Sequence, residues 1–123
     1  MPLRIAETWY ETRRLADGVT LIREAHVAPW LRCNIWHVRG RDRDLVIDTG
    51  MGLRAMVAEV RELSERPLTG IVTHTHFDHS GGLHEFVHRC AHPLEADHRH
   101  VRRTFHQSLE QLNLLRGQND LAG

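Results

Sequence analysis

The sequence predicts an α/β fold in which helices cover a mixed β-sheet. Residues 32–40 and 45–50 both resemble strands, and only the short charged stretch 41–44 joins them, which is typical of an antiparallel hairpin. Strand-like and helix-like segments then alternate along the chain. The continuous apolar run Leu45-Val46-Ile47 indicates that the strand at 45–50 is buried on both faces.

The individual elements follow from local composition. Residues 19–26 are rich in β-forming side chains and predict the first strand. The apolar residues of 53–64 recur at helical spacing and predict a helix that ends before Pro67. The remaining expected elements are a strand at 68–74, a short helix after Gly81 and Gly82, a brief strand at 89–92, a turn or helix from Pro93 and a last helix at 101–116. That last helix carries an apolar stripe of Val101, Phe105, Leu109, Leu112 and Leu115.

At 123 residues the chain has the size of one small domain or of part of a larger one. Acidic and basic side chains cancel at 16 each, so no net field favours nucleic acid or an anionic membrane as a partner. The sequence contains no lysine, which excludes Schiff-base catalysis by that residue. It also lacks a secretory signal, a membrane-length apolar run and a CxxC pair at Cys33 or Cys90, which favours a cytoplasmic protein with reduced thiols.

Four potential metal ligands lie close together in the stretch His74-Thr75-His76-Phe77-Asp78-His79. His74 and His76 follow the strand at 68–74, and residues two apart in extended backbone project to the same side. Asp78 and His79 come after the chain turns and can face a second point nearby. Imidazole and carboxylate together suit one or two zinc ions, with iron or manganese as alternatives. The competing interpretation is a solvated histidine-rich loop with Asp78 as a helix N-cap, and the spacing of four ligand types favours the metal.

Three stretches resemble the metallo-β-lactamase superfamily: residues 73–82 (THTHFDHSGG), Asp48-Thr49-Gly50, and residues 91–97 (AHPLEAD). The resemblance covers about residues 19–100, and residues 33–53 are most similar to its acyl-CoA thioesterase subgroup. It implies an αββα sandwich, of which residues 1–123 would form the N-terminal half.

The resemblance also implies roles for individual residues. His74 and His76 would bind the first metal, and Asp78 and His79 the second. Asp48 would hold the metal loop through hydrogen bonds, although a turn-forming role is the simpler alternative. The implied reaction is hydrolysis, in which a metal-bound hydroxide attacks the carbonyl of a small ester or thioester. A thioester is the favoured substrate, with acyl-CoA as one candidate, and Asp78 would also help to orient the attacking water as a catalytic residue.

A ligand count limits this expectation. A catalytic zinc usually has three protein ligands, whereas the motif offers two for each ion. In the family the others come from the second half of the domain, and nothing after residue 100 matches those motifs. His84 and His88, four apart on one expected helix, are more typical of a solvated face. We therefore expect a truncated domain that binds metal weakly and has little activity alone.

Three alternatives remain open at this point. The chain could be an inactive metal-binding remnant or an interaction module. Half a sandwich would leave an apolar sheet face uncovered, so self-association or a partner chain could complete the fold. Asp48-Thr49-Gly50 is also similar to the motif of retroviral-type aspartic proteases, but those proteins are nearly all β and the protease interpretation leaves the histidine motif unexplained.

Overall fold

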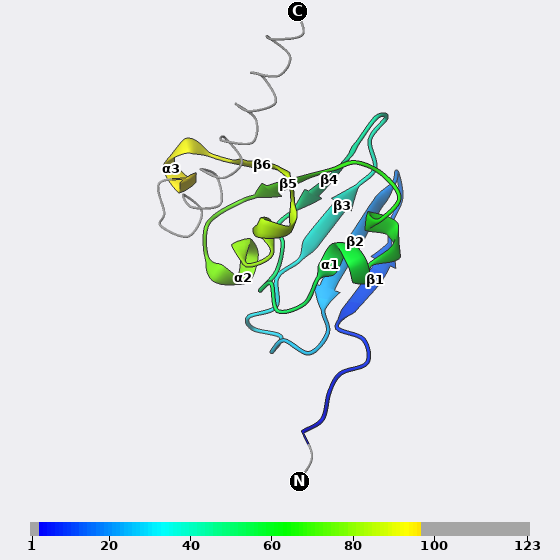
Figure 1. The fold of residues 1–123 in the computed structure, drawn as a ribbon, viewed down its shortest axis with the longest axis vertical. Helices are drawn as coiled ribbons and strands as arrows, with labels where there is room; N and C mark the ends of the chain where they lie inside the picture. Colours follow the sequence, from blue (N-terminus) through cyan, green and yellow to red (C-terminus); the bar gives the residue numbers. More distant parts are fainter. Residues whose placement is uncertain (1–2, 97–123) are drawn as a thin grey trace, which may run out of the picture.

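The computed structural model describes residues 3–96, whose strands form one mixed sheet in the order β1-β2-β3-β4-β5-β6 (Figure 1). β1 to β4 pair antiparallel, whereas β5 is parallel to β4 and β6 is parallel to β5. The predicted mixed sheet and its hairpin are therefore confirmed. The strands are Tyr10–Arg14 (β1), Val19–Glu24 (β2), Ile35–Val38 (β3), Asp44–Ile47 (β4), Leu68–Val72 (β5) and His88–Ala91 (β6).

β1 is a strand that the sequence pattern did not predict. Four of its five residues are exposed, so it lacks the alternation of apolar and polar side chains that marks a half-buried strand. It forms through its pairing with β2, in which Tyr10 lies opposite Glu24. A polar, charged strand is a common way to end a sheet, because it discourages pairing with another chain.

The helices are shorter than predicted. The expected helix at 53–64 is instead one turn of α-helix, α1 (Met56–Glu59), and a 3₁₀ turn, η1 (Arg61–Leu63). Val60 separates them with extended backbone at φ −89° and ψ 106°, and its side chain is buried in the core. The other helical turns are α2 (Phe77–Ser80), η2 (Leu83–Glu85) and α3 (Pro93–Ala96). The helix predicted at 101–116 lies outside the described residues.

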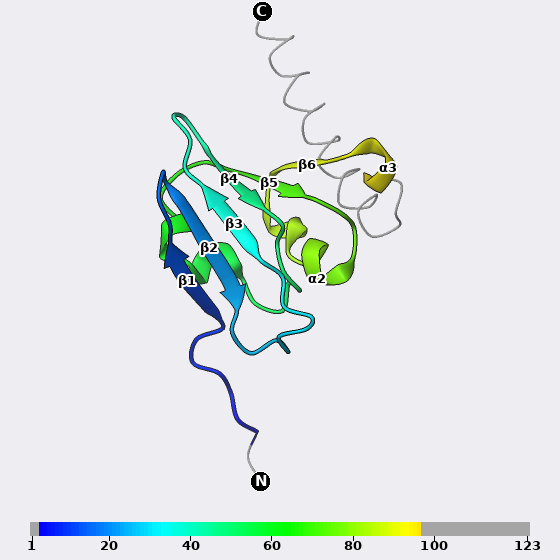
Figure 2. The ribbon, with the colours of Figure 1, turned by 180° about the vertical axis from the view of Figure 1, so that it is seen from behind.

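The sheet has one face toward α1 and one face away from it, as the two opposite views show (Figures 1 and 2). The face toward α1 carries the core, where Ile22, Ile35 and Val46 pack with Met56 and Leu63. The other face carries two rows of half-exposed, mostly apolar side chains that neighbour one another across the strands. These rows are Leu21, Trp36, Ile47 and Ile71, and Val19, Val38 and Leu45.

The parallel pairing of β4 and β5 sets the location of the histidine motif. Both strands end at the same edge of the sheet, so Asp48 after β4 and Thr73 after β5 become neighbours. Such strand ends are where sites form in α/β sheets. Within residues 3–96, none of the helical segments has the length and apolar character needed to cross a bilayer.

Candidate metal centre

The backbone at the end of β4 turns sharply and directs Asp48 toward the histidine motif. Asp48 has φ 63°, a left-handed conformation that aspartate tolerates better than most residues. Its backbone N–H donates to Ile71 O at 2.7 Å, so the turn remains attached to β5. Asp48 is also 4% exposed. The turn therefore positions a buried carboxylate beside the chain that follows β5.

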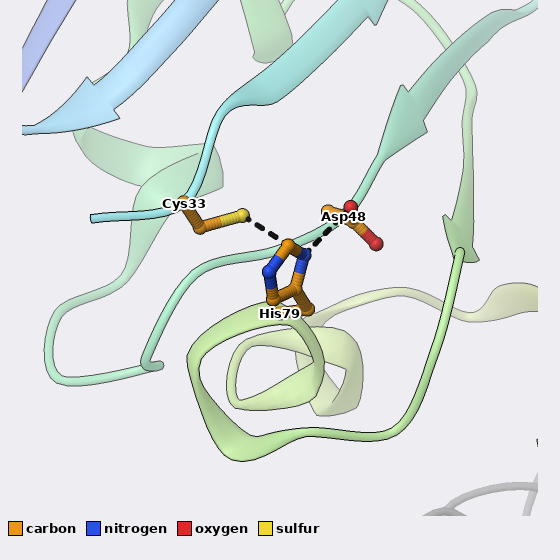
Figure 3. Close-up of side chains that lie close together, drawn as sticks. All are labelled: Cys33, Asp48 and His79. Carbon is orange, nitrogen blue, oxygen red and sulfur yellow. Dashed lines mark hydrogen bonds and ion pairs between the residues drawn. The ribbon is translucent and has the colours of Figure 1, made fainter. Parts of the chain in front are cut away.

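The Asp48 carboxylate connects the two strand ends by accepting several hydrogen bonds. Oδ1 accepts from the backbone N–H of Thr73 at 2.8 Å. The Thr73 hydroxyl lies 3.0 Å from Oδ1 and 2.9 Å from Oδ2. Oδ2 also lies 2.8 Å from Nδ1 of His79 on α2 (Figure 3). One carboxylate thus holds both the start and the end of the histidine motif.

These contacts determine which ring nitrogens are free. A carboxylate only accepts, so His79 Nδ1 carries the proton and the neutral ring keeps its lone pair on Nε2. The Thr73 hydroxyl donates to Asp48, and its oxygen can then accept from His74 Nδ1, which lies 3.0 Å away. His74 would then also keep its lone pair on Nε2. Metal-binding histidines usually have their second nitrogen occupied in this way.

The structure brings the four predicted ligands together in neighbouring pairs, although among the described residues the one group of three or more candidate ligand atoms within 4.8 Å of one another includes only His79 of the four. The rings of His74 and His79 have centroids 4.0 Å apart, and those of His74 and His76 are 4.8 Å apart. Asp78 Oδ2 lies 3.4 Å from His79 Nε2. The side chains of Asp78 and His79 are 17% and 22% exposed, so solvent can reach them. Three imidazoles and one carboxylate at the end of β5 fit a divalent cation chemically, and their assignment as ligands stays a prediction.

Two glycines allow α2 to lie against the turn after β4. A Cβ on Gly81 would lie 2.1 Å from the carbonyl oxygen of Met51, and one on Gly52 would lie 2.1 Å from that of Gly81. Thr49 adds two bonds, because its N–H and its hydroxyl both donate to His79 O. Close backbone approach therefore requires glycine at position 81, and it fixes the end of the histidine motif.

A second support for the loop comes from α3 and was not predicted from the sequence. Glu95 on α3 accepts hydrogen bonds from the backbone N–H and the hydroxyl of buried Thr75, at 3.1 and 2.9 Å. Ser80, also buried, lies 3.2 Å from Thr75 O and 3.1 Å from His76 O. The polar residues between the histidines are therefore structural. In the sequence, only the polar residue Thr75 between two histidines could have suggested this support.

Cys33, which precedes β3, is a neighbour of His79 that sequence reasoning missed. Its Sγ lies 3.4 Å from His79 Nδ1 (Figure 3). With Asp48 and His79 it forms a group whose candidate ligand atoms all lie within 4.8 Å of one another. However, His79 Nδ1 already donates to Asp48, so this nitrogen offers no lone pair to an ion held by the group. In the metal-free chain, burial and the charge of Asp48 raise the pKa of the Cys33 thiol to about 12. We therefore interpret Cys33 as packing behind His79, whose Nε2 faces Asp78.

The same contacts disfavour the aspartic-protease interpretation of Asp48-Thr49-Gly50. In that chemistry two aspartates share a proton, whereas Asp48 accepts hydrogen bonds from Thr73 and His79. Parallel strand pairing and helical turns also differ from an all-β protease.

Comparison with known proteins agrees with this geometry. The sequence pattern of the family described as "Metallo-beta-lactamase superfamily" matches residues 28–118. Human acyl-coenzyme A thioesterase MBLAC2 is 43% identical over 101 residues, and the cattle protein of the same name is 41% identical over 101 residues. Each alignment covers 72% of this chain and 36% of the relative. The chain therefore spans about a third of the length of these relatives.

Solved structures show the fold. A metallo-β-lactamase from Hirschia baltica superimposes with a TM-score of 0.58 at 24% identity, over 76% of this chain and 47% of that one. One from Erythrobacter litoralis gives 0.58 at 22% identity, over 76% and 46%. The six-stranded sheet with its helical turns is thus a fragment of that fold, as predicted.

Proposed function

Because the chain belongs to the metallo-beta-lactamase superfamily, we propose that it is a metal-dependent hydrolase of small esters or thioesters, with acyl-coenzyme A thioesters favoured. The choice of thioester rests on the similarity to human and cattle proteins named acyl-coenzyme A thioesterase. The single observation that carries the metal is the hydrogen bond from His79 Nδ1 to Asp48. When the ring is neutral, this bond places the His79 lone pair on Nε2, which lies beside Asp78 in a ring whose centroid is 4.0 Å from that of His74.

In this proposal His74, His76, Asp78 and His79 hold zinc, with iron or manganese as alternatives. When bound, the metal supplies Lewis-acid chemistry, which polarises a carbonyl and makes water more acidic. Asp48 and Thr73 keep the His79 and His74 imidazoles in the ligating tautomer. The Asp78 carboxylate reaches solvent and can accept a hydrogen bond from the attacking water, which would orient it.

A second candidate is a chain that binds metal without turnover. The motif supplies two ligands for each of two ions, one fewer than a catalytic zinc usually has. The half-exposed apolar rows of the sheet are where a partner chain or a second copy could add a layer. For either candidate, the two free cysteines support a cytoplasmic location.

The test measures bound metal and thioester hydrolysis on the same samples. Purified chain is loaded with zinc, dialysed and analysed by inductively coupled plasma mass spectrometry, and acyl-CoA cleavage is followed by thiol release. His76→Ala removes an exposed imidazole, so the fold is retained while zinc and turnover fall. His84→Ala is the matched control, because this exposed histidine hydrogen-bonds only to Gly81 O among the described residues. It should retain both signals.

The two candidates give different results. Zinc-dependent turnover that a chelator abolishes and added zinc restores would support the hydrolase. Zinc lost in His76→Ala without turnover in the unsubstituted chain would support the binding candidate. A chain that stays metal-free in excess zinc would contradict both.

A further inference from the structure

A cavity of about 520 Å³ lies at the end of the sheet opposite the histidine motif. Its walls come from the β1–β2 turn, the end of β3, the start of β4 and η1. Asp44 lines the cavity, while Asp48 supports the histidine motif four residues further along β4. At about 3.3 Å per residue these positions are roughly 13 Å apart. The cavity is thus separate from the candidate metal centre, and its volume is in the range of small-ligand sites.

Two buried side chains form the floor of this cavity. Thr20 and His37 are 6% and 5% exposed and lie opposite one another in the β2–β3 pairing. His37 Nε2 lies 2.9 Å from Asp44 Oδ2. Because the carboxylate accepts, the neutral ring has its proton on Nε2 and an acceptor lone pair on Nδ1. Within residues 3–96, neither His37 Nδ1 nor the Thr20 hydroxyl has a hydrogen-bond partner.

Arginines surround the cavity. Arg66 is fixed, because it donates to Gly40 O and Arg41 O at 2.7 Å and lies 3.4 Å from Asp44. The guanidinium groups of Arg39 and Arg61 make no hydrogen bond or ion pair with any described residue. The charged lining consists of Arg14, Arg39, Arg61 and Arg66 against Asp44, Glu62 and Glu65, which is four positive and three negative charges and leaves one positive.

Arg14 pairs with Glu62 at 3.9 Å on the surface, and Arg66 pairs with Asp44. Arg39 and Arg61 then stand against Glu65 alone and supply the net positive charge, near a floor that offers one hydroxyl and one acceptor nitrogen. Planar guanidinium groups match the oxygens of a phosphate. The free acceptor on His37 matches a ligand O–H.

We propose that this cavity binds a small phosphate ligand that also carries a hydroxyl group. Arg39 and Arg61 contact the charged oxygens. The Thr20 hydroxyl and His37 Nδ1 contact the inner end of the ligand. Hydrogen phosphate and a phosphate monoester with a free hydroxyl share this chemistry, whereas sulfate has negative oxygens but no O–H at neutral pH.

The test titrates the full chain with inorganic phosphate, glycerol 3-phosphate and sulfate at constant ionic strength. Backbone amide NMR shifts of the β2–β3 region report binding. Both phosphates should bind at least tenfold more tightly than sulfate. Arg61→Gln and Thr20→Val, which keeps the side-chain shape, should each lower phosphate affinity severalfold. The matched control is Arg41→Gln, since the Arg41 side chain is 92% exposed and lies outside the cavity.

Several results would overturn this proposal. One is no saturable phosphate binding to the unsubstituted chain. Another is equal loss of affinity in Arg61→Gln and Arg41→Gln, which would show only general charge attraction. Equal affinities for sulfate and phosphate would show that His37 Nδ1 does not accept a hydrogen bond from the ligand. Loss of phosphate binding in His76→Ala would show that phosphate binds at the candidate metal centre and not in this cavity. Retained binding is expected if the two sites are independent.

Discussion

His79 donates its Nδ1–H to Asp48 Oδ2 over 2.8 Å. A buried carboxylate at the end of β4 therefore determines which nitrogen of a histidine on α2 can bind a metal. The same carboxylate accepts from Thr73 after the end of β5, so one side chain links the two strand ends and orients the ring.

Asp48→Asn should weaken zinc binding by about 10- to 100-fold, which is typical when the partner of a metal-binding histidine is removed. The amide lacks the charge that favours a protonated Nδ1. Competition with a chromophoric zinc chelator gives the affinity. Asp42→Asn, at a hairpin position whose side chain is 78% exposed, should bind zinc like the unsubstituted chain. Equal affinities for all three proteins would show that Asp48 only shapes the turn.

Thr73→Val should lower zinc affinity by a smaller factor than Asp48→Asn does. The substitution keeps the β-branched shape but removes the hydroxyl that links Asp48 to His74 Nδ1. His79 keeps its own bond to Asp48, so only one imidazole loses its orientation. The same chelator competition measures the effect, and Thr12→Val on exposed β1 is the control. A larger loss than in Asp48→Asn would contradict this order of importance.

Cys33 should remain a protonated, unreactive thiol in the folded chain. Burial, and then the charge of Asp48, raise its pKa from 9.0 to about 12. At pH 8, iodoacetamide should therefore modify exposed Cys90 and reach Cys33 only after unfolding. Mass spectrometry of the alkylated chain checks this, and rapid modification of both thiols would contradict it.

The raised pKa also predicts a pH dependence of stability. Between pH 9 and 12 the folded chain keeps the Cys33 proton and the unfolded chain loses it. The free energy of unfolding should therefore fall as pH rises through this window. Urea unfolding of the unsubstituted chain and of Cys33→Ala separates this contribution from that of other groups, including Tyr10. Parallel pH profiles for the two proteins would argue against it.

A cobalt spectrum distinguishes the two possible ligand sets. If Cys33 bound metal, the Co²⁺-loaded chain would show an intense near-ultraviolet thiolate band that Cys33→Ser removes. With His74, His76, Asp78 and His79 as ligands, both proteins should show the same weak visible bands and no thiolate band. His76→Ala should reduce those visible bands.

The sequence by itself determined the sheet and the position of the motif. Alternating segments, the short hairpin connection and the apolar run at 45–47 indicated a mixed sheet, and the pairing confirmed it. The spacing of His74, His76, Asp78 and His79 identified a candidate centre. These features are local, so a single sequence contains the information for them.

Only the tertiary structure decided what surrounds that centre. Cys33 lies 46 positions from His79, and Asp48 lies 31 positions from it, so no local pattern could bring them together. β1 forms through its pairing with β2. The backbone at Val60 is extended and not helical, and the Val60 side chain is buried in the core. The cavity lined by Arg39, Arg61 and His37 likewise arises from four separate segments. Contacts between distant segments depend on how the whole sheet assembles, and local propensity does not encode that assembly.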